Sequence, residues 1–497
     1  MASTVNEIAT TTDRPPELDD RALFGHPRGL GLLFIVEMWE RFSYYGMRGL
    51  LVLYLVNQLS WTDGRAAGLY GTYTGLVFLT PLLGGYLADR FIGTRRSLVI
   101  GGIVIALGHF ALVFETMPTF YLGLALVIIG TGFFKPNVST MVGQIYREGD
   151  PRRDSGFTIF YMGINSGAFL AGIVCGWLAQ RFGWGYGFGA AGVGMLLGLA
   201  IYLWGRDKYL PGIGLSQQAE RAARATAVTG SAVTAGVNPG HALMGALLGV
   251  VIALLGGGNW MGYLYGVTIG AALGLSVLGS KGEERKRVIA LFIVVFFVIF
   301  FWMAFEQAGS SMNLFADRHT DRTIGSFEIP TPWFQSVNAG FIILFAPVFA
   351  GLWVGLGRRG KEPSTALKMA IGLFLLGVGF LFMVAAGNLA DGGAKVSAMW
   401  LTMAYMFHTF GELCLSPVGL SYVTKVAPIR FASLLMGVWF LANSAANKLG
   451  GVLAAMTERI PSQATFYTIF VATSIGAALL MLVLVPLLKR LTTSVKA

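Results

Sequence analysis

The sequence predicts an all-helical integral membrane protein, and two observations carry this prediction. Of its 497 residues, 55% are hydrophobic and only 12% are charged, and the mean hydropathy is +0.66. This composition does not fit the ordinary surface of a soluble protein. In addition, apolar runs long enough to cross roughly 30 Å of hydrocarbon recur along most of the chain. We therefore expect about fourteen transmembrane helices, placed to within several residues.

The apolar runs fall into three groups along the chain. The first group predicts spans at 29–58, 66–88, 96–116, 118–146, 155–179 and 186–205. A polar stretch follows, and then come two spans at 241–258 and 260–279. The third group predicts spans at 287–315, 332–356, 366–389, 396–426, 430–455 and 464–488. The expected domains are a tail at 1–28, a six-helix bundle at 29–205, a loop with an inserted helix pair at 206–286, a second six-helix bundle at 287–490, and a tail at 491–497.

The basic residues predict how the chain is oriented. The net charge is +11, but lysine and arginine lie at every second hydrophobic boundary instead of on one face or tail. This is the positive-inside pattern of membrane proteins, so both termini are predicted to be cytoplasmic, and no nucleic-acid partner is expected. The polar segment before Leu30 lacks the features of a cleavable signal. Cys175 and Cys414 lie in apolar spans, which favours packing over a disulfide or a metal site.

One internal repeat links the two large groups of spans. Residues 78–96, "FLTPLLGGYLADRFIGTRR", and residues 344–362, "LFAPVFAGLWVGLGRRGKE", share a proline, small residues with glycine, an aromatic residue and an arginine pair. Each copy ends the second helix of a group if the pair at 241–279 is an insertion. Two duplicated six-helix bundles around a midplane site are the plan of the major facilitator transporters. The alternative is that glycine and arginine simply end many membrane helices.

The first span carries charges that a membrane helix ordinarily lacks. Within "VEMWERFSYYGMRGL", at about 100° per residue, the polar side chains fall within an arc of about 140°; they are Glu37, Glu40, Arg41, Tyr44, Tyr45 and Arg48. A single charge at the bilayer centre costs about 2.5 to 3.5 kcal/mol, so these charges must pair or line a wet cavity. A structural ion-pair cluster is the alternative to a functional site.

Polar residues in other spans favour the functional interpretation, because no sequence neighbour neutralises them. They are Lys135, Tyr161, Asn165, Glu306, Asn338 and Glu412. Each needs a partner from another helix. For the two asparagines, interhelical hydrogen bonding is an equally good explanation. Pro136 and Pro417 lie close to Lys135 and Glu412 and are expected to free backbone groups at cavity depth.

Five motifs in order resemble the proton-dependent oligopeptide transporter family, the peptide transporter branch of the major facilitator superfamily. They are "EMWERFSYYGMR", "GGYLADRFIGTRR", "FFKPN", "FYMGIN" and "FGELCLSP". The resemblance spans most of the chain, and the spans at 241–279 resemble the helix pair that bacterial members insert between their halves. It therefore implies a multi-pass protein of the bacterial inner membrane that imports di- and tripeptides together with protons by alternating access.

The resemblance also implies roles for individual residues. Proton coupling would involve Glu37, Glu40 and Arg41, with Lys135 as their salt-bridge partner, and Glu306, which would switch with Arg48. The peptide carboxylate would be received by Arg41, Tyr45, Arg48 and Lys135, and the amino terminus by Glu412. The remaining substrate-binding residues would be Tyr161, Asn165, Trp302, Asn338, Ser416 and Trp439. A cytoplasmic loop that governs conformational change would contain Asp89, Arg90, Arg95 and Arg96.

The chemistry of a peptide supports this assignment independently. A di- or tripeptide is a zwitterion and needs fixed charges of opposite sign at the two ends of one cavity; arginine suits its carboxylate because the guanidinium binds it bidentately. Of the five histidines only His109 and His408 fall inside spans, so carboxylates must carry the protons. No cofactor is expected. His408 lies one turn from Glu412, but two ligands on one helix make a weak metal site.

Three rival functions remain open at this stage. A carrier of nitrate or another small anion on the same scaffold would not need an acid, such as Glu412, opposite its basic pocket. A membrane-embedded enzyme is disfavoured because the spans contain neither an HExxH zinc motif nor a GxSxG nucleophile elbow. Drug export is disfavoured by the fixed opposite charges. The expected partners are peptides, protons and the lipid bilayer, and a monomer is compatible with the sequence.

Overall fold

The computed structural model describes residues 20–147, 150–215, 238–255 and 258–492, and most of these residues are helical. Parts of both predicted tails, most of the polar stretch between the bundles and residues 256–257 of the predicted span 241–258 lie outside the described residues. Among the residues described, ten helices are long and apolar enough to cross a membrane. The all-helical membrane class is thus confirmed, whereas the count of about fourteen crossings stays a prediction.

The first bundle begins at Arg28, and its helices match the predicted spans to within about five residues. They are α1 (Arg28–Leu53), α2 (Asp63–Leu87), α3 (Thr94–Val113), α4 (Met117–Ile145), α5 (Arg153–Phe182) and α6 (Trp184–Tyr209), with π-helical turns η2 (Tyr54–Gln58) and η3 (Ala88–Ile92). Local chemistry sets several boundaries. The side chain of Thr62 caps α2 by accepting from the backbone N–H of Arg65. Gly93 and Gly183 end η3 and α5 at φ values of 87° and 113°, which favour glycine.

The second bundle contains α10 (Gly282–Phe305), η5 (Glu306–Gly309), α11 (Ser311–Arg318), α12 (Trp333–Arg358), α13 (Thr365–Asp391), α14 (Ala398–Val426), η6 (Ile429–Phe431), α15 (Ala432–Ala454), η7 (Ala455–Glu458) and α16 (Gln463–Leu491). Four short strands lie between its helices: β1 (Thr320–Asp321), β2 (Thr323–Ile324), β3 (Phe327–Glu328) and β4 (Val396–Ser397). β1 pairs with β4 in parallel, and β2 pairs with β3 antiparallel. The two prolines of the predicted repeat, Pro81 and Pro347, lie inside α2 and α12, the second long helix of each bundle.

One predicted span is not a single helix. The sequence predicts a continuous span over 287–315, but α10 ends at Phe305 and Glu306 begins a 3-10 turn before α11. Gly309 in this turn lies directly against α2, because a Cβ on Gly309 would collide with the hydroxyl of Tyr70. The apolar pattern gave no sign of the break. The break places Glu306 at a helix end, where its carboxylate faces the first bundle.

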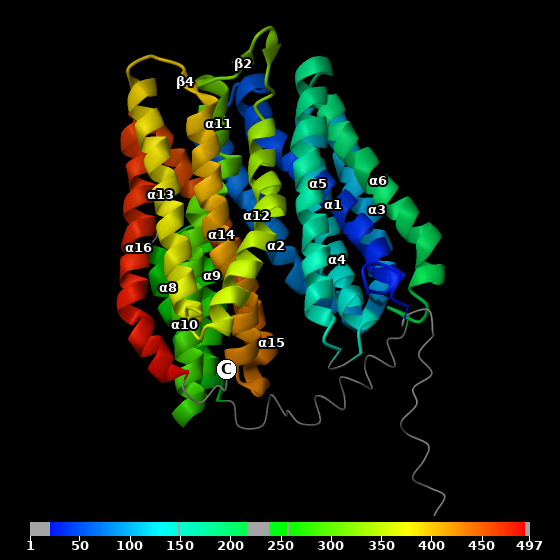
Figure 1. The fold of residues 1–497 in the computed structure, drawn as a ribbon, viewed down its shortest axis with the longest axis vertical. Helices are drawn as coiled ribbons and strands as arrows, with labels where there is room; N and C mark the ends of the chain where they lie inside the picture. Colours follow the sequence, from blue (N-terminus) through cyan, green and yellow to red (C-terminus); the bar gives the residue numbers. More distant parts are fainter. Residues whose placement is uncertain (1–19, 148–149, 216–237, 256–257, 493–497) are drawn as a thin grey trace, which may run out of the picture.

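The two bundles lie side by side and contact each other most closely toward the end where α11, β2 and β4 lie (Figure 1). The contacts join α2 to α15 and α5 to α12. A Cβ on Gly71 would lie 2.8 Å from the Cα of Gly451, and a Cβ on Gly176 would lie 2.9 Å from the Cβ of Pro332. At the same end, Arg318 forms an ion pair with Asp63 at 2.6 Å. The bundles are therefore closed against each other at the α11 end.

The inserted pair consists of α8 (Pro239–Leu255) and α9 (Trp260–Leu273), which continues as the π-helical turn η4 (Gly274–Leu278). Figure 1 shows both helices on the side of the second bundle, where α9 contacts α15 and η4 contacts α10. The side chain of Asn259 caps α9 by accepting from the N–H of Gly262. The structure thus contains the predicted pair at the predicted place in the chain.

Candidate functional site

The charged face of α1 is buried and paired largely within itself. Arg41 Nε lies 2.9 Å from Glu37 Oε1 and 2.8 Å from Glu40 Oε2, and all three residues are no more than 4% exposed. The i, i+4 spacing of Glu37 and Arg41 puts them one turn apart on the same face. Glu37 Oε2, Glu40 Oε1 and Arg41 Nη2 find no hydrogen-bond partner among the described residues. The cluster therefore holds more hydrogen-bonding capacity than its neighbours satisfy.

Lys135 occupies a different place from the one that the resemblance implied. Its ammonium lies over the ring of Phe78, 4.4 Å from the centroid. Within the described part of the chain, no ion pair joins Lys135 to Glu37 or Glu40. Arg41, which lies on α1 with the two glutamates, engages both of their carboxylates. The implied salt bridge to Lys135 is not formed in this conformation. The role of Lys135 in proton coupling stays a prediction.

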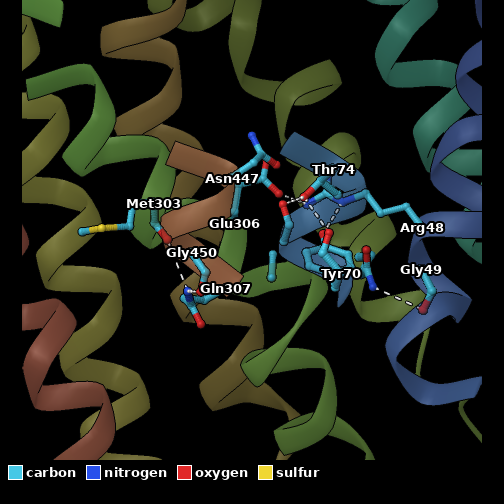
Figure 2. Close-up of polar contacts among 12 residues, drawn as sticks. Arg48, Gly49, Tyr70, Thr74, Met303, Glu306, Gln307, Asn447 and Gly450 are labelled. Carbon is cyan, nitrogen blue, oxygen red and sulfur yellow. Dashed lines mark hydrogen bonds and ion pairs between the residues drawn. The ribbon is translucent and has the colours of Figure 1, made fainter. Parts of the chain in front are cut away.

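An ion pair between the bundles lies at the break after α10. Arg48 Nη2 of α1 contacts Glu306 Oε2 at 2.5 Å, and Arg48 Nε donates to the hydroxyl of Tyr70 at 2.6 Å. Figure 2 shows these side chains converging from α1, α2 and η5. The guanidinium also faces the rings of Tyr45 and Tyr70 at 5.5 Å and 5.9 Å. The structure thus brings together the two residues that the resemblance paired, in an environment of buried aromatic rings.

Glu412 is held by neutral donors from two other helices. Tyr161 of α5 donates its hydroxyl to Glu412 Oε1 at 3.2 Å. Asn338 Nδ2 of α12 donates to Glu412 Oε2 at 3.2 Å and to Thr409 Oγ1 at 2.9 Å. Asn165 donates to the backbone carbonyl of Tyr161. This carboxylate therefore lies at the contact between the bundles and, among the described residues, has no ion-pair partner.

A single cavity gathers most of the predicted binding residues. Its lining includes Tyr45, Arg48, Tyr161, Asn165, Trp302, Glu306, Asn338 and Glu412. Phe78, whose ring the Lys135 ammonium contacts, also lines the cavity. Sequence reasoning missed Tyr70, Phe305, Gln335 and Tyr405, of which the last three line the same cavity. The missed residues carry no charge, and only their place in the fold reveals them.

Other predicted residues lie outside this lining. Trp439 packs into the core of the second bundle and is 7% exposed, so a place in a substrate pocket is not seen in this conformation. Ser416 lies on α14, but its side chain falls outside what the structure describes. His408 packs against the ring of Phe380 with centroids 4.5 Å apart. No group of three or more metal-binding side chains is found within the described residues.

The predicted conformational loop forms η3 and the start of α3. Asp89 and Arg90 lie in η3, and Arg95 and Arg96 lie in the first turn of α3. Arg95 is buried and reaches the segment after α6, where its Nε donates to the carbonyl of Ile213 at 2.7 Å and its Nη1 pairs with Asp207 at 2.8 Å. Arg95 thus joins α3 to the end of α6. The loop's role in conformational change stays a prediction.

A larger cavity, of about 1030 Å³, lies between α1, α3, α5 and α6. Its lining is mostly aromatic and aliphatic, with Glu115 as its one carboxylate among the described lining residues. It offers no pair of opposed charges to a polar solute. We therefore take the cavity around Arg48, Glu306 and Glu412 as the candidate site.

Comparison with known proteins places this geometry in a family. The family model described as "PTR2: POT family" matches residues 95–471. The chain belongs to the POT family. It is 38% identical to an uncharacterized transporter, YclF, of Bacillus subtilis over 99% of both chains. It is also 38% identical to the peptide transporter YePEPT of Yersinia enterocolitica, over 97% of this chain and 98% of that protein.

Solved structures of POT proteins share the fold. A peptide transporter POT in complex with sulfate matches with a TM-score of 0.80 at 35% identity, over 97% of this chain and 99% of that one. A POT family transporter in complex with 5-aminolevulinic acid matches with a TM-score of 0.78 at 31% identity, over 94% and 98% of the two chains. These likenesses confirm the predicted major facilitator fold and a multi-pass membrane protein. The POT family consists of transporters, so the enzyme interpretation is set aside.

Proposed function

We propose that this POT protein imports di- and tripeptides together with protons by alternating access. The observation that carries the proposal is one cavity between the bundles that is lined by Arg48 of α1 and Glu412 of α14. Among the described residues, the carboxylate of Glu412 has no ion-pair partner. A peptide is a zwitterion, and each of its termini finds a complementary charge there. The relatives named as peptide transporters support this choice of substrate.

The peptide's amino terminus is assigned to Glu412. Among the described residues, its carboxylate accepts only from the neutral groups of Tyr161 and Asn338, so an ammonium can add a charge-assisted hydrogen bond. The carboxylate end is assigned to Arg48 and Lys135. Arg48 is engaged by Glu306, whereas the Lys135 ammonium lies over the ring of Phe78 and forms no ion pair among the described residues. A peptide carboxylate would therefore meet Lys135 without first breaking an ion pair.

Proton coupling is assigned to the contact between Arg48 and Glu306. A carboxylate at this depth is tolerated because the guanidinium and the hydroxyl of Tyr70 surround it. Once protonated, Glu306 loses most of its attraction for Arg48, and one link between the bundles weakens. Arg48 is then released toward the peptide carboxylate. The charge state of Glu306 would thus decide whether the bundles stay joined at this point.

The positive-inside pattern assigns the α11 end to the outside of the cytoplasmic membrane of a bacterium. Because the bundles are closed at that end, the conformation corresponds to one that faces the cytoplasm. Both termini would then lie in the cytoplasm. The contacts of Asp63 with Arg318 and of Gly64 with Glu458 would form part of the closed outer side.

Uptake into liposomes tests the proposed substrate. With an imposed gradient, acid outside, we expect labelled dialanine to accumulate above its equilibrium level, while nitrate and free alanine do not. Free alanine fails because its two termini are too close to span both charged walls. Dialanine uptake that the gradient does not stimulate would contradict the proposal, and uptake of nitrate in its place would favour a small-anion carrier.

The assignment of Lys135 is tested by Lys135→Met, which retains much of the side-chain length without the charge. We expect the affinity for dialanine to fall about tenfold or more, as the loss of a charge-assisted hydrogen bond costs about 1.5 to 3 kcal/mol. A carboxyl-amidated dialanine should lose little affinity, because it carries no carboxylate for Lys135. Competition against labelled dialanine measures both. Equal losses for the two ligands would remove Lys135 from the carboxylate site.

A further inference from the structure

The inserted helices α8 and α9 are joined into one stiff unit by glycines. A Cβ on Gly249 would collide with the carbonyl of Gly266, and a Cβ on Gly270 would collide with the carbonyl of Gly245. The two backbones therefore touch directly along the length of the pair, as small residues allow in membranes. A unit packed in this way moves as one body.

The end of this unit that joins α10 is fixed to the second bundle. Arg430, between α14 and α15, donates to the carbonyl of Gly279 at 3.0 Å and forms an ion pair with Glu284 at the start of α10. Arg285 Nε donates to the carbonyl of Ser280 at 2.8 Å. These bonds lie within the unit and the second bundle, so a rocking motion of the first bundle leaves them intact.

Farther along α9, the unit reaches the contact between α2 and α15. The hydroxyl of Tyr265 lies 2.8 Å from Ser444 Oγ of α15, and Ser444 Oγ lies 2.5 Å from the carbonyl oxygen of Gly75 in α2. A carbonyl only accepts, so Ser444 donates to Gly75 and Tyr265 donates to Ser444. Leu76 of α2 packs against the buried side chains of Met261, Tyr265 and Ala445. One directed chain of hydroxyls therefore joins the inserted pair, the second bundle and the first.

At Gly75, the backbone of α2 comes close to both α9 and α15. A Cβ there would lie 3.1 Å from the hydroxyl of Tyr265 and 3.2 Å from the carbonyl oxygen of Ser444. When the bundles separate at the α11 end, Ser444 loses its acceptor on α2, while Tyr265 keeps its contact with Ser444. Only the closed conformation forms both hydrogen bonds, from Tyr265 to Ser444 and from Ser444 to Gly75. Each hydrogen bond in such a series polarises the next.

We propose that the inserted pair favours the conformation closed at the α11 end, and that Tyr265 is the positioning residue through which it acts. Tyr265 fixes the direction of the Ser444 hydroxyl and strengthens its bond to Gly75. The proposal concerns the balance between two conformations in the absence of any solute. Its test is therefore independent of the proposed substrate and of proton coupling.

Distances between spin labels on the two bundles test this proposal. The labels are attached at Arg181→Cys and Lys395→Cys, which lie at exposed positions on the first and second bundle. The native cysteines, Cys175 and Cys414, are buried and react poorly. Pulsed electron resonance on the full chain in lipid nanodiscs, without peptide, gives the fraction of molecules with a longer distance.

We expect Tyr265→Phe to raise the ratio of the long-distance to the short-distance population about two- to fivefold. Ser444→Ala should raise it about three- to fifteenfold, the range for one intramembrane hydrogen bond. The double variant should match Ser444→Ala alone, because Tyr265 acts only through that hydroxyl. Tyr263→Phe is the matched control: its hydroxyl lies on the same helix and bonds no other residue that the structure describes.

A wild-type distribution in Tyr265→Phe would overturn the proposal, as would an equal shift in Tyr263→Phe. Thermal unfolding of each variant shows whether it is folded. If Tyr265→Phe fails to fold, Ser444→Ala tests the proposal instead. An unchanged distribution of label distances in Ser444→Ala would also overturn it.

Discussion

Glu306→Gln should abolish the accumulation of peptide driven by a proton gradient while leaving peptide exchange intact. Glutamine is uncharged at every pH, so residue 306 can no longer alternate between pairing with Arg48 and releasing it. The structure shows what that alternation controls, because the contact between Arg48 and Glu306 joins α1 to η5 across the bundle interface. Exchange survives because the loaded carrier can cross in both directions without net proton movement.

The expected effect is large. One charge that crosses 100 mV gains about 2.3 kcal/mol, which corresponds to roughly fiftyfold accumulation for one coupled proton. Glu306→Gln should lose all of this and only equilibrate peptide across the membrane. Two assays on the same protein preparation measure the two activities separately. One measures accumulation under a proton gradient, and the other measures counterflow into peptide-loaded liposomes without a gradient.

Glu283→Gln is the matched control for this experiment. It removes a carboxylate from the exposed first turn of α10, the same helix that leads to Glu306. We expect it to keep both activities. Normal accumulation by Glu306→Gln would refute the coupling role. Loss of both activities in a folded Glu306→Gln protein would point instead to a structural ion pair.

Glu412→Gln should weaken the binding of ordinary dipeptides more than tenfold and spare dipeptides whose amino group is acetylated. Loss of a charge-assisted hydrogen bond costs about 1.5 to 3 kcal/mol. The acetylated ligand carries no ammonium and has little to lose. The introduced glutamine would still accept from Tyr161, but its amide group would oppose the donor of Asn338 unless that side chain turned over.

Competition of each ligand against labelled dialanine measures this difference. Tyr161→Phe is a useful companion, because it removes one neutral donor and leaves the carboxyl group of Glu412 in place. It should weaken the binding of both ligands less than Glu412→Gln weakens that of the ordinary dipeptide. If Glu412→Gln reduces the affinity for the free and the acetylated peptide equally, Glu412 does not receive the amino terminus.

The sequence predicted the helices well because hydrocarbon imposes one requirement on every span. An apolar run of sufficient length must form a helix to satisfy its own backbone, so hydropathy alone located the spans other than 287–315 to within about five residues. The break at Glu306 escaped this reasoning. At the break, Gly309 lies against the hydroxyl of Tyr70, a contact between helices far apart in the sequence that hydropathy does not reveal.

The charged residues of the candidate site could also be predicted from the sequence, because an ionisable side chain within an apolar span is costly and therefore rare. Arg48, Glu306 and Glu412 do line one cavity. Tyr70 was missed because a tyrosine in a membrane helix is ordinary until its partner is known. The salt bridge expected of Lys135 is not formed in this conformation and stays a prediction, because the sequence does not show which of Arg41 and Lys135 engages Glu37 and Glu40 in a given state.

The account rests on peptide and proton moving together, and the most direct test records proton entry while peptide is added. Liposomes that contain the protein and an internal pH-sensitive dye, held at a negative internal potential, are mixed with dialanine. We predict internal acidification on addition of dialanine, none with free alanine or nitrate, and none with dialanine in Glu306→Gln. Dialanine that enters without acidification, or acidification that Glu306→Gln preserves, would contradict the account.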